Sequence, residues 1–236
     1  MTLQNEKILV IGNKPYSCFP IAKIIDTFSY NVRCNFIVPG NNNGILYDQL
    51  ALCNHLYENF VIHPASLEKI INIYNNEYDL SYINKNYIPF VNNMRKYNKV
   101  FHAKFGSSQN HILQNLNSPF KFSKIPRTGL NVVLSLINQG KKVVVTNFSI
   151  TEEVRHSYCL KKEVAENYSK DESATCHSTR DEIKILRWLH ENKFIDASLC
   201  LLGDQETPLL DLSGLSASDY IIDLIKKTYG ICEIKK

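Results

Sequence analysis

Short apolar runs rich in β-branched residues alternate with helical patterns along this chain of 236 residues. Residues 7–11 form the first run, which ends in Gly12-Asn13-Lys14-Pro15 and leads into a helical repeat over 21–28. Alternating strands and helices are typical of α/β proteins, in which helices cover both faces of a mostly parallel sheet. Ligands of such sheets bind beyond the carboxyl ends of the strands. We therefore expect a site at that edge.

The same periodicity predicts the other elements. Strands are expected at 30–34, 50–53, 142–146 and 197–202, and helices at 65–75, 129–137, 179–189 and 220–228. Residues 78–116 match no pattern that we can assign. Asparagines follow several of the predicted strands, which makes their amides candidate ligand contacts at the expected edge; they are Asn13, Asn35, Asn54 and Asn147.

Composition indicates one compact globular unit, because 44% of the residues are hydrophobic, 21% are charged and no long linker interrupts the chain. The net charge of +4 is scattered, so nucleic-acid binding is not predicted. Seven cysteines without a C-x-x-C pair indicate reduced thiols. No signal region and no membrane-spanning run is visible. We expect a cytoplasmic protein, at most peripheral at the inner membrane.

The segment around His177 has the pattern of a capped amphipathic helix. Ser178 or Thr179 can cap the helix, and Asp181 and Glu182 suit its positive end. An imidazole held beside a capped helix start can be oriented as a general base. The alternative is a loop histidine without a role. The predicted buried stripe of this helix comprises Ile185, Leu186 and Leu189.

Two glycine-containing turns are candidate phosphate contacts. Gly12-Asn13-Lys14-Pro15 lacks the spacing of a dinucleotide fingerprint or a P-loop, but its amides can hold a phosphate at a helix start. Arg127-Thr128-Gly129 opens an apolar helix with a cation, a hydroxyl and a glycine that a ligand can approach. The alternatives are an ordinary β-α turn and a simple helix cap. No D-x-D motif and no metal-ligand spacing occurs, which predicts a site without metal.

Five short blocks, spread in order over most of the chain, resemble the bacterial sialyltransferases of glycosyltransferase family 42, which use CMP-sialic acid. That family ends its first strand in Gly-Asn-Gly-Pro-Ser, its second in Arg-Cys-Asn and its third in Asn. It also has a Ser-Gly that opens an apolar helix, and a His-Ser followed by Asp-Ile-Lys. The corresponding residues are Gly12-Asn13-Lys14-Pro15, Arg33-Cys34-Asn35, Asn54, Thr128-Gly129, and His177-Ser178 with Glu182-Ile183-Lys184.

The resemblance implies a Rossmann-like, GT-A-like nucleotide-binding domain over 1–150 and 176–236, with a small lid at 151–175. It implies inverting, metal-independent transfer of sialic acid from CMP-sialic acid to a galactose-containing surface glycan such as lipooligosaccharide, without a cofactor. His177 would be the general base. Tyr158 or Tyr168 would stabilise the departing phosphate, with lid packing as the alternative. The implied donor contacts are Gly12, Asn13, Asn35, Asn54, Arg127, Thr128, Gly129 and Ser178.

Three departures from the family pattern leave other functions open. Lys14 replaces the second glycine of the first turn, Phe36 replaces a glutamine, and Thr151 stands where a phosphate-contacting tyrosine is expected. The alternatives are transfer of a related sugar acid such as Kdo from its CMP donor, and a non-catalytic relative that binds a nucleotide or glycan. An NAD-dependent oxidoreductase is disfavoured, because the glycine fingerprint is absent.

The expected partners are the CMP-sugar donor and a glycan or glycolipid acceptor. The family commonly forms oligomers, so the resemblance also implies a homo-oligomer. Lysines between Lys226 and Lys236 are a candidate contact with anionic lipid. The alternative is a solvated helix face.

Overall fold

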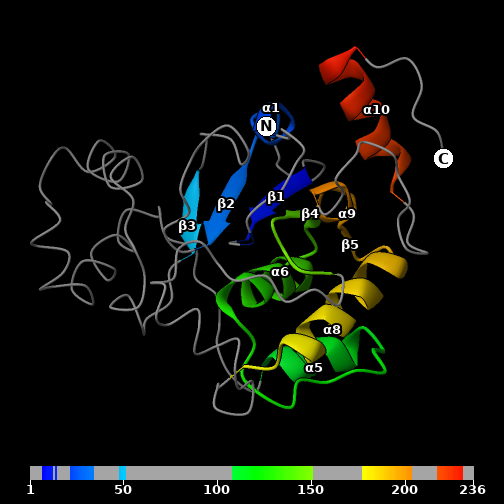
Figure 1. Ribbon diagram of the computed structural model, residues 1–236. Helices are drawn as coiled ribbons and strands as arrows, with labels where there is room; N and C mark the ends of the chain where they lie inside the picture. The colour runs from blue at the N-terminus through cyan, green and yellow to red at the C-terminus, as the bar shows by residue number, and fades with distance from the viewer. Residues whose placement is uncertain are drawn as a thin grey trace, which may run out of the picture.

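The computed structural model describes residues 7–12, 14, 22–34, 48–51, 108–150, 177–203 and 217–230. Within these ranges, five parallel strands form one sheet in the order β3-β2-β1-β4-β5 (Figure 1). They are β1 (Lys7–Ile11), β2 (Asn31–Cys34), β3 (Gln49–Ala51), β4 (Lys142–Thr146) and β5 (Ile195–Asp196). The helices are α1 (Ala22–Ile25), α5 (Ser108–Asn115), α6 (Thr128–Asn138), α8 (Thr179–Glu191), α9 (Ser198–Gly203) and α10 (Asp219–Tyr229). The predicted α/β class is confirmed.

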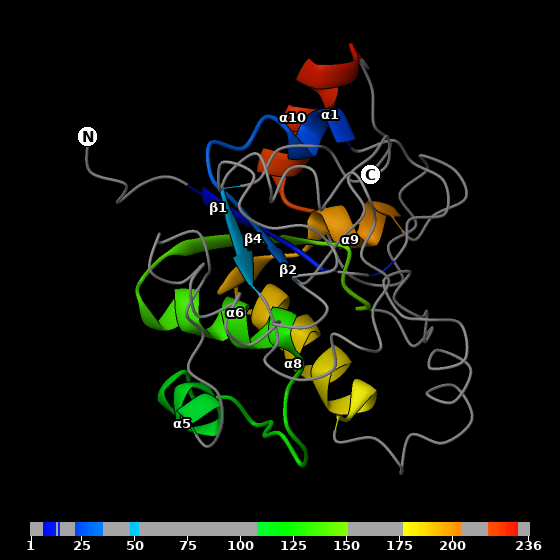
Figure 2. The same ribbon diagram turned by 90° about the vertical axis from the view of Figure 1, so that its left-hand side faces the viewer.

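Helices cover both faces of the sheet, as Figures 1 and 2 show. Side chains alternate along a strand, so Ile8 and Val10 of β1 join the core formed with α5, α6 and α8. Leu9 and Ile11 join the opposite core, formed with α1 and α10. Helix α9 contributes side chains to both cores. The two cores together bury the sheet on both sides, which explains its continuous apolar runs.

The order of the strands reverses between β1 and β4. Strands β2 and β3 lie on one side of β1, whereas β4 and β5 lie on the other. The two central strands pair in register from Lys7 with Lys142 to Ile11 with Thr146. Ligands of open α/β sheets bind at such a reversal, in the crevice beyond the carboxyl ends of the strands. The residues after Ile11 and Thr146 therefore occupy the favoured position for a ligand.

The predicted strand at 197–202 is wrong, because helix α9 occupies Ser198–Gly203 and strand β5 precedes it. Periodicity alone does not separate a short apolar strand from a short buried helix. The side chain of Asp196 decides the local structure. Its Oδ1 accepts hydrogen bonds from the backbone N–H and the hydroxyl of Ser198, at 3.1 and 2.6 Å. These bonds turn the chain and start the helix.

Other predicted elements are confirmed with small shifts in their ends. The predicted helix at 129–137 is α6, and Gly140 at φ +71° follows it. The predicted terminal helix is α10, which ends at Gly230 in the left-handed conformation. The helix predicted at 65–75 and the lid predicted at 151–175 lie outside the described residues. Helix α5 falls at the end of the segment to which the sequence assigned no pattern.

The apolar face of α10 is part of the core. Ile221, Ile222 and Ile225 are buried, and two of them pack with α1 and β1. This face is therefore not available to enter a lipid interface, and a contact with anionic lipid would depend on the charges of the lysines. Of these, Lys226 and Lys227 lie on α10, whereas Lys235 and Lys236 lie outside the described residues. Across the described ranges, no helix combines the length and the apolar character needed to cross a membrane.

Candidate functional site

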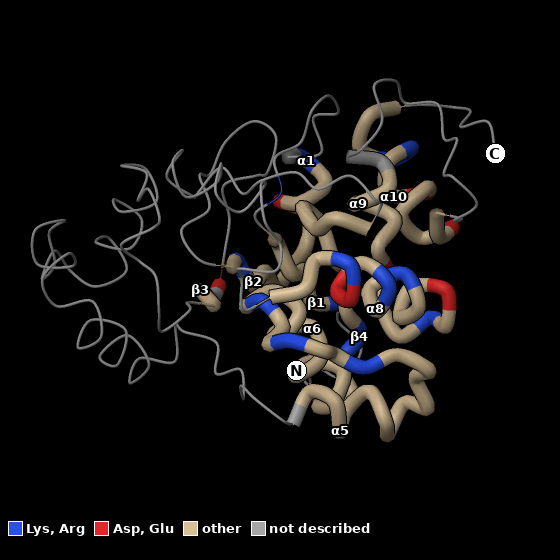
Figure 3. Tube along the Cα trace, turned by 60° about the horizontal axis from the view of Figure 1, so that its bottom comes forward, with Lys and Arg blue, Asp and Glu red and all other residues tan. Residues whose placement is uncertain are grey.

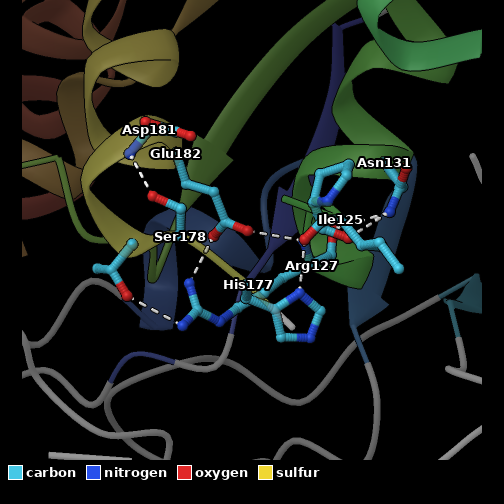
Figure 4. Close-up of polar contacts among 9 residues, drawn as sticks. Ile125, Arg127, Asn131, His177, Ser178, Asp181 and Glu182 are labelled. Carbon is cyan, nitrogen blue, oxygen red and sulfur yellow. Dashed lines mark hydrogen bonds and ion pairs between the residues drawn. The ribbon is translucent and has the colours of Figure 1, made fainter. Parts of the chain in front are cut away.

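The starts of α6 and α8 lie at the carboxyl edge of the sheet. Each helix is joined by a short turn to the beginning of the strand that follows it, so each runs antiparallel to the strands. A Cβ built on Gly129 would lie 2.5 Å from the ring of Phe148 and 3.5 Å from Cys34 Sγ. Phe148 follows β4 closely and Cys34 ends β2. Three predicted site residues, Arg127, His177 and Ser178, come together at these helix starts (Figure 4).

Ser178 caps helix α8 as predicted. Its Oγ accepts a hydrogen bond from the backbone N–H of Asp181 at 3.3 Å. Asp181 and Glu182 occupy the first turn, where the helix dipole favours negative charge. The predicted stripe is buried, and it comprises Ile185, Leu186 and Leu189. The cap fixes the direction in which the chain enters α8 and with it the position of His177.

His177 lies just before the cap and is oriented by a backbone carbonyl. Its Nδ1 is 2.6 Å from the carbonyl oxygen of Ile125. A carbonyl oxygen only accepts hydrogen bonds, so this contact assigns the proton to Nδ1. In the neutral ring the lone pair is then on Nε2, which is the nitrogen that can take up a proton. Figure 4 shows the imidazole projecting away from the Arg127–Glu182 contact.

Arg127 forms an ion pair within the protein. Its Nη1 lies 2.8 Å from Oε2 of Glu182, and its backbone N–H donates to Oε1 of the same carboxylate at 2.7 Å. Its Nη2 donates to Oγ1 of Thr179 at 2.9 Å. Glu182 is buried, whereas the Arg127 side chain is 38% exposed. The guanidinium predicted to contact the donor therefore also fastens the loop before α6 to the first turn of α8.

A second clamp joins the same two segments. The backbone N–H and the hydroxyl of Ser123 both donate to Oδ2 of Asp181, at 2.9 and 2.5 Å. Burial acts to raise the pKa of Asp181, but the hydrogen bonds from Ser123 and Ser178 and the charge of Lys184 outweigh it and lower the pKa. The ionised carboxylate thus stabilises the folded loop that presents the Ile125 carbonyl to His177.

Replacing Asp181 with asparagine should lower the free energy of unfolding at pH 7 by about 1 kcal/mol. This is the usual contribution of a charge-assisted hydrogen bond, reduced because the carboxylate is partly exposed to solvent. Because the folded-state pKa is lowered, this stabilisation is present above the unfolded-state value and is lost as the pH falls through the folded value. Urea denaturation of both proteins should show the difference shrinking below about pH 4. A difference that stays constant into acid would contradict this account.

The first turn of α6 holds two further predicted contacts. Thr128 is its first residue and is buried, and the side chain of Arg127 makes no capping bond to this helix. Packing favours glycine at position 129, because a Cβ there would lie 2.5 Å from the Phe148 ring. Packing thus gives one reason for a glycine here, and the contact of its backbone with a ligand stays a prediction. Asn131, which sequence reasoning missed, donates through Nδ2 to the carbonyl of Pro126 at 2.8 Å and holds the loop in place.

Backbone contacts tie together the chain segments that follow β1 and β4. Gly12 N–H donates to the carbonyl of Thr146 at 2.8 Å, and Lys14 N–H donates to the carbonyl of Asn147 at 2.9 Å. In return, Nδ2 of Asn147 donates to the carbonyl of Lys14 at 2.7 Å. Asn147 is buried at φ +58°, a conformation that asparagine tolerates better than most residues. Asn147, a candidate ligand contact, thus holds the segments after β1 and β4 together at the reversal of strand order.

Several predicted site residues lie outside the described part of the chain, namely Asn13, Asn35, Asn54, Tyr158 and Tyr168. Their roles stay predictions. In the ranges that are described, no three His, Cys, Asp or Glu side chains gather as a possible metal site. Metal independence likewise stays a prediction.

Arg33 belongs to the second of the five sequence blocks, and the structure gives it a distinct position. It lies on β2 with its side chain 2% exposed. In register it stands beside Ile11 of β1 and Leu50 of β3. The sequence signal that could have singled out Arg33 is a charged residue inside an apolar strand. Burying a guanidinium is costly without compensating contacts, so such a residue has a specific role.

Comparison with protein-family models and with curated proteins found no match to this chain. The resemblance to a sialyltransferase family therefore depends on the five sequence blocks.

Proposed function

We propose that this chain is an inverting, metal-independent glycosyltransferase that moves sialic acid from CMP-sialic acid to a galactose-containing surface glycan. The orientation of His177 by the Ile125 carbonyl supports the proposal most directly, because it leaves Nε2 as the basic nitrogen. The identity of the donor is supported by the five sequence blocks alone. The proposed location is the cytoplasm, at the inner membrane where the glycan is built.

The arrangement of the sheet is compatible with a nucleotide donor. The order β3-β2-β1-β4-β5 is that of the first five strands of the dinucleotide-binding sheet, with the reversal between β1 and β4. We assign 1–150 and 176–236 to a Rossmann-like, GT-A-like domain and 151–175 to a lid. In this assignment the donor lies in the crevice at the reversal, near the positive end of α6.

The proposed reaction is a single displacement at the anomeric carbon. Nε2 of His177 takes the proton of the acceptor hydroxyl while its oxygen forms the new bond to the sugar. The bond from the anomeric carbon to the phosphate oxygen breaks, and CMP leaves with the electron pair. Tyr158 or Tyr168 would donate a hydrogen bond to the departing phosphate. Clamping of the loop by Arg127 and Asp181 keeps the Ile125 carbonyl in place throughout.

The test is release of CMP from CMP-sialic acid and from CMP-Kdo, with and without a lactose-type acceptor. Release that the acceptor stimulates is expected with one of the two donors, and the faster donor identifies the sugar. A protein that is folded by circular dichroism and releases CMP from neither donor would contradict the proposal.

A second candidate is a non-catalytic protein that binds a nucleotide or a glycan. Two contacts favour it, because the charge of Arg127 is matched by Glu182 and the segments after β1 and β4 are fastened to each other. Calorimetric titration with CMP separates the candidates. Binding of CMP without any turnover of either donor would favour this second function.

A further inference from the structure

Helix α8 carries a row of basic residues that begins beside His177. Arg180, Lys184 and Arg187 are spaced by four and three residues, so they share one face of the helix. Arg180 and Lys184 are exposed, and Arg187 is partly exposed. At about 1.5 Å of rise per residue, the row is about 10 Å long. It runs opposite to the buried stripe that packs on the sheet.

The acidic residues in the first turn of α8 offset the charge of this row only in part, because Asp181 interacts with Lys184, whose charge helps to lower the pKa of that carboxylate. Asp181 accepts both hydrogen bonds from Ser123, and Glu182 is buried in its contact with Arg127. Both carboxylates therefore face the loop before α6. The remaining acid of the helix, Glu191, is its last residue; it is exposed and lies four residues after Arg187, on the same face as the row. The three basic residues of the row therefore outnumber the two acids beside it, Asp181 and Glu191.

Two lysines extend the row across the neighbouring loop. Lys121 is exposed and Lys124 is partly exposed, and the bond from Ser123 to Asp181 holds this stretch against the first turn of α8. Figure 3 shows basic positions on both segments on the same side of the molecule. We call this set the basic surface; it comprises Lys121, Lys124, Arg180, Lys184 and Arg187.

We propose that the basic surface binds an acceptor glycan that carries negative charge, as a phosphate or a carboxylate, next to the sugar that receives the transfer. This inference rests on the proposed function, since it takes His177 as the base. A hydroxyl that reaches His177 lies at the start of the row, so the adjoining units of the acceptor extend along it. Guanidinium groups pair with phosphate and carboxylate through parallel hydrogen bonds, which makes an anionic glycan the complementary partner.

The test compares two triple variants of equal charge change. One removes exposed charges of the basic surface, Lys121→Gln, Arg180→Gln and Lys184→Gln. The control removes exposed charges elsewhere, Lys142→Gln, Lys193→Gln and Lys227→Gln. Affinity is measured by fluorescence anisotropy, without donor, for a labelled galactose-terminated oligosaccharide in a neutral, a phosphorylated and a carboxylated form.

Wild type and control should bind the two charged forms more tightly than the neutral form. The variant of the basic surface should bind the charged forms about tenfold more weakly, and the loss should diminish at high salt. The stronger of the two charged ligands identifies the source of the anion. Equal binding of all three forms by wild type, or an equal loss in the control, would overturn the inference.

The binding assay needs no donor, so its result is independent of turnover. If CMP release is absent but the preference for charged glycans is lost only in the variant of the basic surface, the transferase proposal fails and the surface stands. If release occurs but charged and neutral glycans bind alike, the surface proposal fails and the transferase stands.

Discussion

Replacing His177 with alanine is expected to lower acceptor-stimulated CMP release by about 10²- to 10⁴-fold, the usual contribution of a positioned general base. The reason lies in the contact between Nδ1 and the Ile125 carbonyl at 2.6 Å, which holds the imidazole in the tautomer whose Nε2 accepts a proton. The substitution removes that nitrogen and leaves the clamps at Arg127 and Asp181 unchanged. Initial rates of CMP release at saturating donor measure the effect.

A glutamine at the same position separates proton transfer from positioning. The amide of His177→Gln can still donate a hydrogen bond to the Ile125 carbonyl, but it is not a base at neutral pH. We expect His177→Gln to unfold at the same urea concentration as wild type and to be as slow as His177→Ala. Full activity in either variant would exclude His177 as the base and return it to an ordinary loop residue.

The matched control is another histidine that lies on the surface. His111 lies on α5 and is exposed, so His111→Ala changes the same residue type away from the helix starts. Its rate of CMP release should equal that of wild type. A loss comparable to that of His177→Ala would show that the assay reports a general effect of removing histidine.

The helix start at His177 could be predicted because its signals are local. The cap, the acidic first turn and the apolar stripe all lie within one segment, and each is confirmed. Strands β1 and β4 could be predicted because both faces of each are buried, which makes the apolar run continuous. The error at 197–202 came from the same rule, applied where a side chain of Asp196 starts a helix instead.

The contacts that assemble the site could not be predicted, because they join segments far apart in the sequence. Arg127 and Glu182 are separated by 55 residues, and Ser123 and Asp181 by 58. The group that orients His177 is a backbone carbonyl, which every residue type carries. Its position depends on the path of the loop and leaves no mark in the residue pattern. The sequence therefore indicated the candidate base but not the contacts that hold it.

Replacing Gly12 with alanine should destabilise the protein by about 3 kcal/mol, at the upper end for overpacking. A Cβ at this position would lie 2.3 Å from the carbonyl oxygen of Asn147 and 3.0 Å from a ring carbon of Phe148. The nearest atom belongs to the backbone, so no side-chain rotation relieves the clash. The two segments must separate instead, which strains the bond from Gly12 N–H to Thr146 and the bonds between Lys14 and Asn147.

Two other glycines provide graded controls for this substitution. Gly129→Ala would meet the Phe148 ring at 2.5 Å, but a ring can shift, so the cost should be smaller, about 2 kcal/mol. Gly140→Ala meets nothing within 4 Å, and its φ of +71° alone should cost about 1 kcal/mol. Urea midpoints at constant m-value give the three free energies. If Gly12→Ala cost no more than Gly140→Ala, the segments after β1 and β4 would have to separate freely, and the bonds from Gly12 to Thr146 and between Lys14 and Asn147 would not hold them together.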